Sequence, residues 1–262
     1  MKGREMRRRG WMLPGALCLL TCMLVTAGAA ATETVSLHAN FTPDRLGAST
    51  NLSATVLFGS TVAGPVPPVT SVTTYGPAGM SLDVHGVGVC TVSASRLEAL
   101  GPSACPADSR LGFGRATGLL ELAGELVPGP FTLEFFLAPR QQGALSMLIY
   151  VDAVTPAAEE FVMVAKEVHG PRPYGLGISF AVPIVPSLPG AALGWVEHVL
   201  VTLGSAHAAY YRTIHGKRRL FHVTGLTVPE KCPTGGFPVE SQMSFADGNS
   251  TVAKTTIPCP SR

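Results

Sequence analysis

A run of basic and aromatic residues between positions 210 and 222 could contact a negatively charged ligand. The run predicts a β-hairpin that reverses at His215-Gly216 or Gly216-Lys217. The candidate anion-binding residues are Tyr210, Tyr211, Arg212, Lys217, Arg218 and Arg219. Positive charge and ring stacking at one end of a sheet favour an anionic polymer. From the sequence alone we favour a simpler alternative, an edge hairpin kept soluble by its lysine and arginine side chains.

Three glutamates are the candidates for acid-base chemistry. Glu121, Glu125 and Glu134 fall in neighbouring strand-like segments, where two of them could approach as a general acid and a general base. The alternative is that all three are carboxylates on the solvent-facing side of a half-exposed sheet. We favour this alternative, so the three glutamates receive no catalytic assignment.

Histidines are concentrated late in the chain and raise the question of a metal site. They are His198, His207, His215 and His222. A metal site needs two or three of them to converge. Their separations of nine, eight and seven residues fit no short ligand motif. We therefore expect no metal site, although strands could still bring the four together.

The common motifs of catalysis and cofactor binding are absent from the sequence. We find no nucleophile elbow, phosphate-binding loop, H-E-x-x-H sequence or dinucleotide fingerprint. The sequence Gly112-Phe113-Gly114 is an isolated G-x-G pair, which is typical of a turn or a bulge. We therefore expect no catalytic residue and no cofactor, and a non-catalytic protein is favoured over an enzyme.

The first 31 residues predict an export signal. Arg7, Arg8 and Arg9 precede an apolar stretch from Trp11 to Val25, and small residues then supply a cleavage site. The stretch is shorter than the roughly 20 residues of a membrane-spanning helix, so a permanent anchor is disfavoured. Removal of residues 1–31 reduces the 19 basic and 17 acidic residues to 14 and 16, because the leader holds five Lys/Arg and one Glu. A secreted or cell-envelope protein without a membrane span or a nucleic-acid partner is expected.

Four cysteines remain after the leader is removed, and an even number in an exported chain predicts disulfides. Pairing between neighbours in sequence joins Cys90 to Cys105 and Cys232 to Cys259, closing loops of 15 and 27 residues. The two bonds would stabilise the fold by about 3 and about 3.5 kcal/mol, in that order. A zinc site is the disfavoured alternative, because no short C-x-x-C pair is present.

Local residues support both cysteine pairs. A short helix between Cys90 and Cys105 is predicted by a capping box with Ser95 as N-cap and Glu98 reaching back, and by Gly101 at its end. At the C-terminus, a turn at 247–249 that sets Ala246 opposite Ser250 would place Cys259 opposite Phe237. Residues 233–236 must then fold back for Cys232 to reach Cys259, which two glycines allow.

Strand-like segments separated by glycine, proline or asparagine and aspartate recur along the whole chain. They are expected at 34–41, 51–58, 119–127, 131–137, 145–151, 160–168, 177–182, 195–203, 210–214, 219–226, 239–245 and 250–257. The fold class is therefore all-β, an antiparallel β-sandwich, either one large or two small. An N-terminal β domain at 32–155 and a C-terminal β region at 156–262 are expected, or one continuous sandwich.

Two segments resemble uncharacterised secreted actinobacterial proteins. Residues 77–116 contain a Pro-Ala-Gly turn, a cysteine, a short helix and a C-P-x-x-S-x-x-G-x-G segment, and residues 228–260 match the C-P-x-G-G-F-P to P-C-P tail. The resemblance covers about half of the chain after the leader. It implies export and a β-rich, disulfide-bonded fold, and it implies no known activity.

Three hypotheses for function follow from these residues. The first is a non-catalytic secreted or cell-surface β protein with a structural or binding role. The second is an extracellular hydrolase that uses dispersed glutamates and histidines. The third is a binder of an anionic envelope polymer or glycan through the 210–222 hairpin. The sequence does not identify the ligand.

Overall fold

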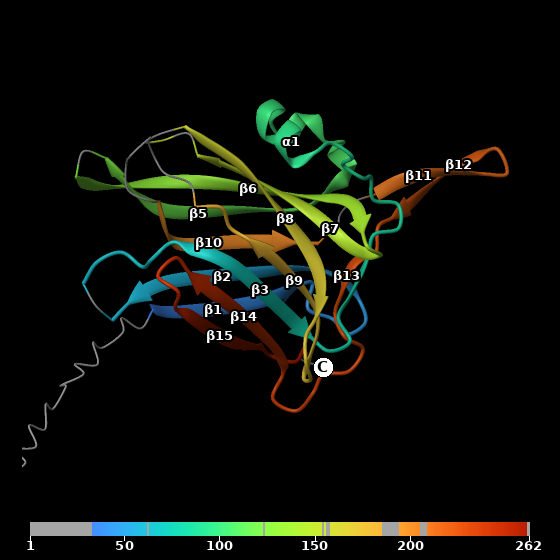
Figure 1. Ribbon diagram of the computed structural model, residues 1–262. Helices are drawn as coiled ribbons and strands as arrows, with labels where there is room; N and C mark the ends of the chain where they lie inside the picture. Colours follow the sequence, from blue (N-terminus) through green and yellow to red (C-terminus); the bar gives the residue numbers. More distant parts are fainter. Residues whose placement is uncertain are drawn as a thin grey trace, which may run out of the picture. The chain divides into compact units, whose positions relative to one another are not determined.

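The computed structural model describes residues 33–61, 63–122, 124–153, 155, 158–184, 194–204 and 209–260 (Figure 1). The predicted leader at 1–31 and His207 lie outside the described residues. The chain from Ala31 to Arg262 forms one compact unit. Within the described ranges, no helix has the length and hydropathy needed to cross a membrane.

Strands make up most of the described chain, which confirms the predicted all-β class. The strands are β1 (Glu33–Thr42), β2 (Ser49–Ser60), β3 (Val69–Pro77), β4 (Ser81–Asp83), β5 (Arg110–Leu122), β6 (Glu125–Gln141), β7 (Ala144–Ala153), β8 (Glu159–His169), β9 (Tyr174–Ala181), β10 (Trp195–Leu203), β11 (Ala209–Ile214), β12 (Lys217–His222), β13 (Gly225–Thr227), β14 (Phe237–Phe245) and β15 (Ser250–Ile257). One α-helix, α1 (Ala94–Leu100), and two short 3-10 turns, η1 (Pro102–Ala104) and η2 (Ala107–Ser109), lie between β4 and β5.

Thirteen of the described strands form one antiparallel sheet. Their order is β15-β14-β3-β9-β8-β7-β6-β5-β10-β2-β13-β4, with β1 paired to β2. The order mixes early and late strands: β3 lies between β14 and β9, and β10 lies between β5 and β2. A single sheet therefore uses strands from before and after residue 155.

The two ends of this strand order pack face to face, which gives the sheet its sandwich character (Figure 1). Phe41 on β1 and Phe237 on β14 meet edge to face, with ring centroids 5.7 Å apart. Leu37, Val239 and Ile257 complete this core and are almost fully buried. The alternation of apolar and polar residues in β1, β14 and β15 supplies one buried face per strand.

Residues 135–138 of β6 and 145–151 of β7 are buried on both faces. On the inner face, Phe135 and Ile149 belong to the main core. On the outer face, Phe136 and Tyr150 are covered by α1, whose Leu97 is fully buried, and by the adjacent disulfide (Figure 1). Double coverage explains why residues 147–151 of β7 are continuously apolar or aromatic rather than alternating.

Both predicted disulfides are confirmed. Cys90 and Cys105 are bonded with Cα atoms 4.9 Å apart, and Cys232 and Cys259 are bonded with Cα atoms 5.8 Å apart. The predicted fold-back at 233–236 is also present, since the Gly236 amide donates to the Pro233 carbonyl over 3.0 Å.

The predicted register of the last hairpin is wrong by two residues. Ser244 pairs with Ser250, so Phe237 lies opposite Ile257 and not opposite Cys259. The turn is longer than expected, because the Phe245 amide donates to the Asn249 carbonyl beyond the last strand pair.

The helix begins two residues earlier than the capping box predicted. Ser93 is the N-cap, and its hydroxyl accepts a hydrogen bond from the Arg96 amide at 3.2 Å. Ser95 is therefore inside the helix. The predicted end is confirmed, since Gly101 has a φ of 74° and its amide donates to the Leu97 carbonyl.

The strand predicted over 119–127 is also wrong. The chain reverses between Leu122, the end of β5, and Glu125, the start of β6, and these two residues pair with each other. Gly124 has a φ of 83°, which favours glycine in this turn. Strands β3 and β4 were not predicted.

Candidate functional site

The predicted basic hairpin is formed by β11 and β12, which among the described strands pair only with each other. Figure 1 shows this two-stranded ribbon extending away from the large sheet. His215 and Gly216 form its tip with φ values of 49° and 73°. Two positive φ values in a two-residue loop are typical of a type I′ turn, which matches the twist of the flanking strands.

One face of the hairpin presents an aromatic ring with a guanidinium stacked on it. The register pairs Tyr211 with Leu220 and Thr213 with Arg218, so these four side chains share a face. The Cζ atom of Arg218 lies 4.0 Å from the centroid of the Tyr211 ring. Tyr211 is 57% exposed and Leu220 is 50% exposed. An apolar and cationic surface therefore faces solvent.

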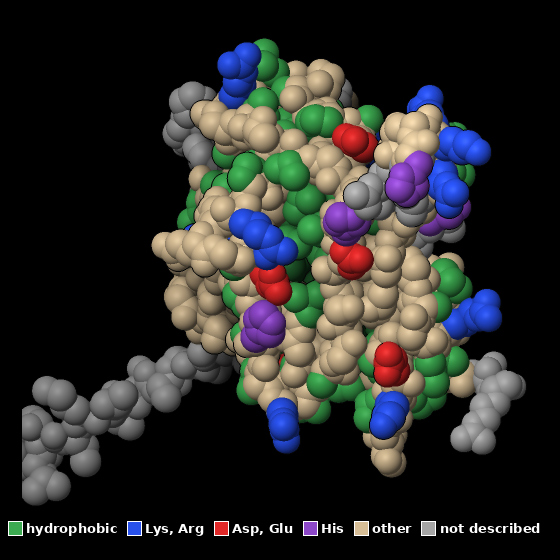
Figure 2. Space-filling model, turned by 90° about the vertical axis from the view of Figure 1, so that its right-hand side faces the viewer, with side chains coloured by type: hydrophobic (Ala, Val, Ile, Leu, Met, Phe, Trp, Pro, Cys, Tyr) green, Lys and Arg blue, Asp and Glu red, His purple; other side chains and the backbone are tan. Residues whose placement is uncertain are grey.

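The opposite face presents Lys217 and Arg219, and both are exposed. The backbones of Tyr210 and Arg212 belong to β11, while their side chains lie outside the described part of the chain. Figure 2, which looks onto the end from which the hairpin extends, shows lysine, arginine and histidine side chains gathered toward its upper right. Positive charge is thus available on both faces.

The segment around the hairpin has no acidic counter-charge in sequence. Residues 198–229 contain four Lys/Arg and four His but no Asp or Glu. No carboxylate nearby in sequence therefore offsets the positive charge of the hairpin. Residues 32–262 as a whole nevertheless hold more acidic than basic residues.

The three predicted acid-base glutamates do not converge. Glu121 and Glu125 lie on either side of the β5–β6 turn, at positions that point to opposite faces. Glu134 lies opposite Phe113, about 26 Å along the strands from Glu121. The Glu134 carboxylate instead accepts a hydrogen bond from Arg110 at 3.3 Å.

The described late histidines lie on different elements. His198 lies on β10, His215 at the hairpin tip and His222 at the base of the hairpin. Across the described ranges, no group of three or more His, Cys, Asp or Glu side chains is placed to hold a metal ion.

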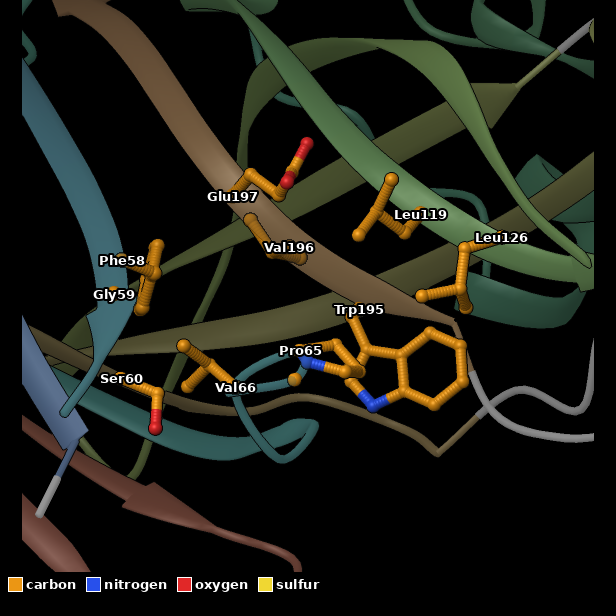
Figure 3. Close-up of a pocket in the computed structure, with 11 residues that line it drawn as sticks. Phe58, Gly59, Ser60, Pro65, Val66, Leu119, Leu126, Trp195, Val196 and Glu197 are labelled. Atoms are coloured by element: carbon orange, nitrogen blue, oxygen red, sulfur yellow. The ribbon is translucent and has the colours of Figure 1, made fainter. Parts of the chain in front are cut away.

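A pocket of about 290 Å³ lies where β10 begins (Figure 3). Its lining residues are Phe58, Gly59, Ser60, Gly64, Pro65, Val66, Leu119, Leu126, Trp195, Val196 and Glu197. The pairing of β10 with β5 skips Glu197, so this residue is the extra one of a β-bulge. Bulges re-aim side chains and are frequent beside functional sites. Sequence reasoning missed this pocket, because its walls come from four separate segments.

A second pocket, of about 380 Å³, lies at the end of the sandwich near the β6–β7 turn. Leu82, Leu145 and Ile178 line its apolar part, and Arg140, Glu167 and His169 are charged or titratable lining residues. Figure 2 shows a hydrophobic hollow bordered by basic, acidic and histidine side chains on this end.

One carboxylate oxygen of Glu167, Oε2, accepts a hydrogen bond from the Leu145 amide at 3.1 Å. His169 Nε2 lies 3.9 Å from the other oxygen, Oε1. Neither residue was singled out in the sequence, because each only continues the alternation at the end of β8. The arrangement places a largely exposed histidine within ion-pair distance of a carboxylate at this pocket.

A buried carboxylate joins the outer strands of the sheet. Glu240 on β14 accepts hydrogen bonds from Gln242 at 2.8 Å and from Lys254 at 3.0 Å, and Tyr174 also donates to it. These donors, Gln242 foremost, lower the pKa of Glu240 against the opposing effect of burial. Burial, followed by the hydrogen bond to Glu240, raises the pKa of Tyr174. Gln242, Lys254 and Tyr174 each have Glu240 as a hydrogen-bond partner, and a buried carboxylate with several such donors is typical of a structural network.

Comparison with protein-family models, curated proteins and solved structures found no match.

Proposed function

We propose that the protein is a non-catalytic binding protein that acts outside the cytoplasm and holds an anionic polymer through the β11–β12 hairpin. Two disulfides between sequence neighbours support an oxidising compartment, since such bonds are rare in reducing ones. The predicted export signal at 1–31 supports the same location. The polymer is then an envelope polymer or an acidic glycan.

The observation that supports this function best is the separation of the hairpin from the large sheet. An edge hairpin would use its charges to prevent further strand pairing. This hairpin instead pairs only with itself among the described strands, and it exposes Tyr211 and Leu220 to solvent. A two-stranded ribbon is marginally stable by itself. Exposed apolar groups on such a ribbon favour a contact surface over a solubility device.

The distribution of charge favours a polymer over a small anion. Lys217, Arg218 and Arg219 are consecutive, so they project to both faces of β12. A small anion needs donors that converge on one point, whereas a polyanion can contact charges spread along a ribbon. The Tyr211 ring beneath Arg218 holds the guanidinium in place and offers a surface for stacking.

The test measures binding of fluorescein-labelled heparin oligosaccharide and of labelled polyphosphate across a range of salt concentrations. The triple variant Lys217→Ala, Arg218→Ala and Arg219→Ala should bind at least about tenfold more weakly, with a shallower dependence on salt. The matched control removes three exposed cations elsewhere, by Arg45→Ala, Arg96→Ala and Lys166→Ala.

Equal weakening by both triple variants would mean that only net charge matters, and would reject the hairpin as the binding element. Unchanged binding in the hairpin variant would reject the proposal as well. A preference between heparin and polyphosphate would identify the sulfated glycan or the phosphate polymer as the better model of the ligand.

A second candidate function is hydrolysis at the pocket that contains Arg140, Glu167 and His169. The 3.9 Å approach of His169 to Glu167 favours it. His169 would accept a proton from water as the hydroxide adds to an ester carbonyl, and Arg140 would stabilise the oxyanion. Collapse of this intermediate would break the C–O bond, and the imidazolium of His169 would return the proton to the leaving alkoxide, which gives the acid and the alcohol. Ester turnover that His169→Ala abolishes would support this candidate. Absent turnover, or turnover unchanged in the variant, would reject it.

A further inference from the structure

The pocket at the start of β10 has an apolar wall and a single charged lining residue. Trp195, Pro65 and Leu126 contribute apolar surface, and Figure 3 shows the indole ring beside Pro65 with Leu126 on its other side. The Glu197 carboxylate lies at the opposite edge of the group, beyond Val196. A ligand that fills the pocket therefore contacts the aromatic surface at one edge and the carboxylate at the other.

The surroundings of the pocket contain carboxylates and no cation in sequence. The lining residues lie in three stretches, 46–95, 116–139 and 173–211, and none of these contains a lysine or an arginine. Glu197 is exposed, and within the described ranges it takes part in no ion pair. Glu121 lies on β5 two residues beyond the lining residue Leu119, on the same face. The stretches that line this pocket therefore contribute negative charge to it and no lysine or arginine.

We propose that this pocket binds an organic cation with an apolar body, such as an alkylammonium group. The apolar body packs against Trp195, Pro65 and Leu126, where burial of hydrocarbon is favourable. The ammonium group is attracted by the opposite charge of the Glu197 carboxylate, which belongs to a residue that lines the pocket. A volume of about 290 Å³ is at the lower limit for small-molecule sites, so the ligand is small.

This site is separate from the basic hairpin in both position and sign of charge. The start of β10 and the end of β2, which form the pocket, lie at the left in Figure 1, and the hairpin lies at the right. An anionic polymer at the hairpin and a small cation at Trp195 can therefore bind independently. The inference does not rest on the proposed function of the hairpin.

Tryptophan fluorescence can test the proposal, because the chain holds only two tryptophans, Trp11 and Trp195. In the full chain with Trp11→Phe, all tryptophan emission comes from Trp195. Titration with hexyltrimethylammonium should give a saturable change in emission, and calorimetry should give the same dissociation constant. Hexyl sulfate and hexanol, which match the alkyl chain, should bind at least about fivefold more weakly.

The variant Glu197→Gln should weaken hexyltrimethylammonium binding about fivefold and leave hexanol binding unchanged. The control Glu230→Gln, an exposed carboxylate outside this pocket, should change neither. Equal affinity for hexyltrimethylammonium, hexyl sulfate and hexanol would overturn the proposal, because it would show that the pocket binds the alkyl chain alone. A cation preference that persists in Glu197→Gln, or no saturable binding by calorimetry and fluorescence, would overturn it too.

Discussion

Glu240 shows how a single buried charge can stabilise several strands. It is 6% exposed, and its hydrogen-bond donors come from β9, β14 and β15. A buried carboxylate that loses these donors keeps its desolvation cost without compensation. The network therefore ties β9 to the C-terminal hairpin across β3, which lies between them in the sheet.

The lowered pKa of Glu240 predicts a specific pH dependence of stability. Because the folded pKa lies below the ordinary value of 4.5, the carboxylate stabilises the fold above pH 4.5. That contribution is lost as the pH falls through the folded pKa. Glu240→Gln should lower the free energy of unfolding by about 2 kcal/mol at pH 7 and by less in acid. Urea denaturation between pH 3 and 7 measures this, and parallel curves for both proteins would contradict it.

Tyr211 predicts how much of the hairpin's affinity depends on its ring. Tyr211→Ala should weaken heparin binding about threefold, because it removes the surface on which Arg218 stacks. Tyr211→Phe keeps the ring and should bind like the natural protein. Phe113→Ala removes another exposed aromatic outside the hairpin and serves as the control. Equal effects of Tyr211→Ala and Phe113→Ala in titrations would argue against a role for this ring.

Which candidate residues can be predicted from sequence depends on how far apart they are along the chain. The hairpin residues fall within 13 positions, so a local pattern was enough to place them together. Trp195 and Pro65, or Arg140 and His169, come from segments far apart in sequence. Their proximity depends on the order of strands in the sheet, which no local pattern encodes. The glutamates failed for a different reason, because they lie close in sequence but the unpredicted reversal at Gly124 and the length of β5 and β6 set Glu134 apart from Glu121.

At the scale of elements, α1 and its disulfide cover a cluster formed by residues of β6, β7 and β8. Replacing both Cys90 and Cys105 with Ala should lower the free energy of unfolding by about 3 kcal/mol, because the unfolded chain gains the entropy of an open 15-residue loop. The loss can be measured by urea denaturation. A change of less than about 1 kcal/mol would mean that packing of Leu97 alone holds the cover in place.

Element boundaries were predictable where local chemistry decides them. Strands β10 and β15 begin and end at the predicted residues, and Gly101 ends the helix as predicted. The predicted helix start was wrong because both Ser93 and Ser95 are suitable N-cap residues. The structure has Ser93 as the N-cap, since its hydroxyl accepts a hydrogen bond from the Arg96 amide. The turn between β5 and β6 was missed, since apolar residues on both sides conceal the reversal at Gly124.

At the scale of the molecule, the interleaved strand order predicts cooperative unfolding. Early strands such as β3 depend on late strands such as β14 for pairing, so neither half of the chain has a complete sheet. Thermal unfolding followed by calorimetry and by circular dichroism should therefore show one coincident transition. Residues 32–155 produced alone should not fold. Two separate transitions, or a folded fragment, would show two independent domains.

The two ends of the molecule differ in charge and in the ligands they suit. The segment of the hairpin has cations and no carboxylate, and the stretches that line the Trp195 pocket have carboxylates and no cation. Opposite local fields separated in this way favour different ligands at different places. The proposed function therefore requires that a polyanion contacts the β11–β12 hairpin and not the surface around Trp195.

Hydrogen exchange of the protein with and without heparin oligosaccharide tests that location most directly. We predict slower amide exchange in β11 and β12 on binding, with little change around Trp195 and in the pocket of Glu167. Protection confined to another part of the sheet, with unchanged exchange in the hairpin, would contradict the proposal that the hairpin is the binding element.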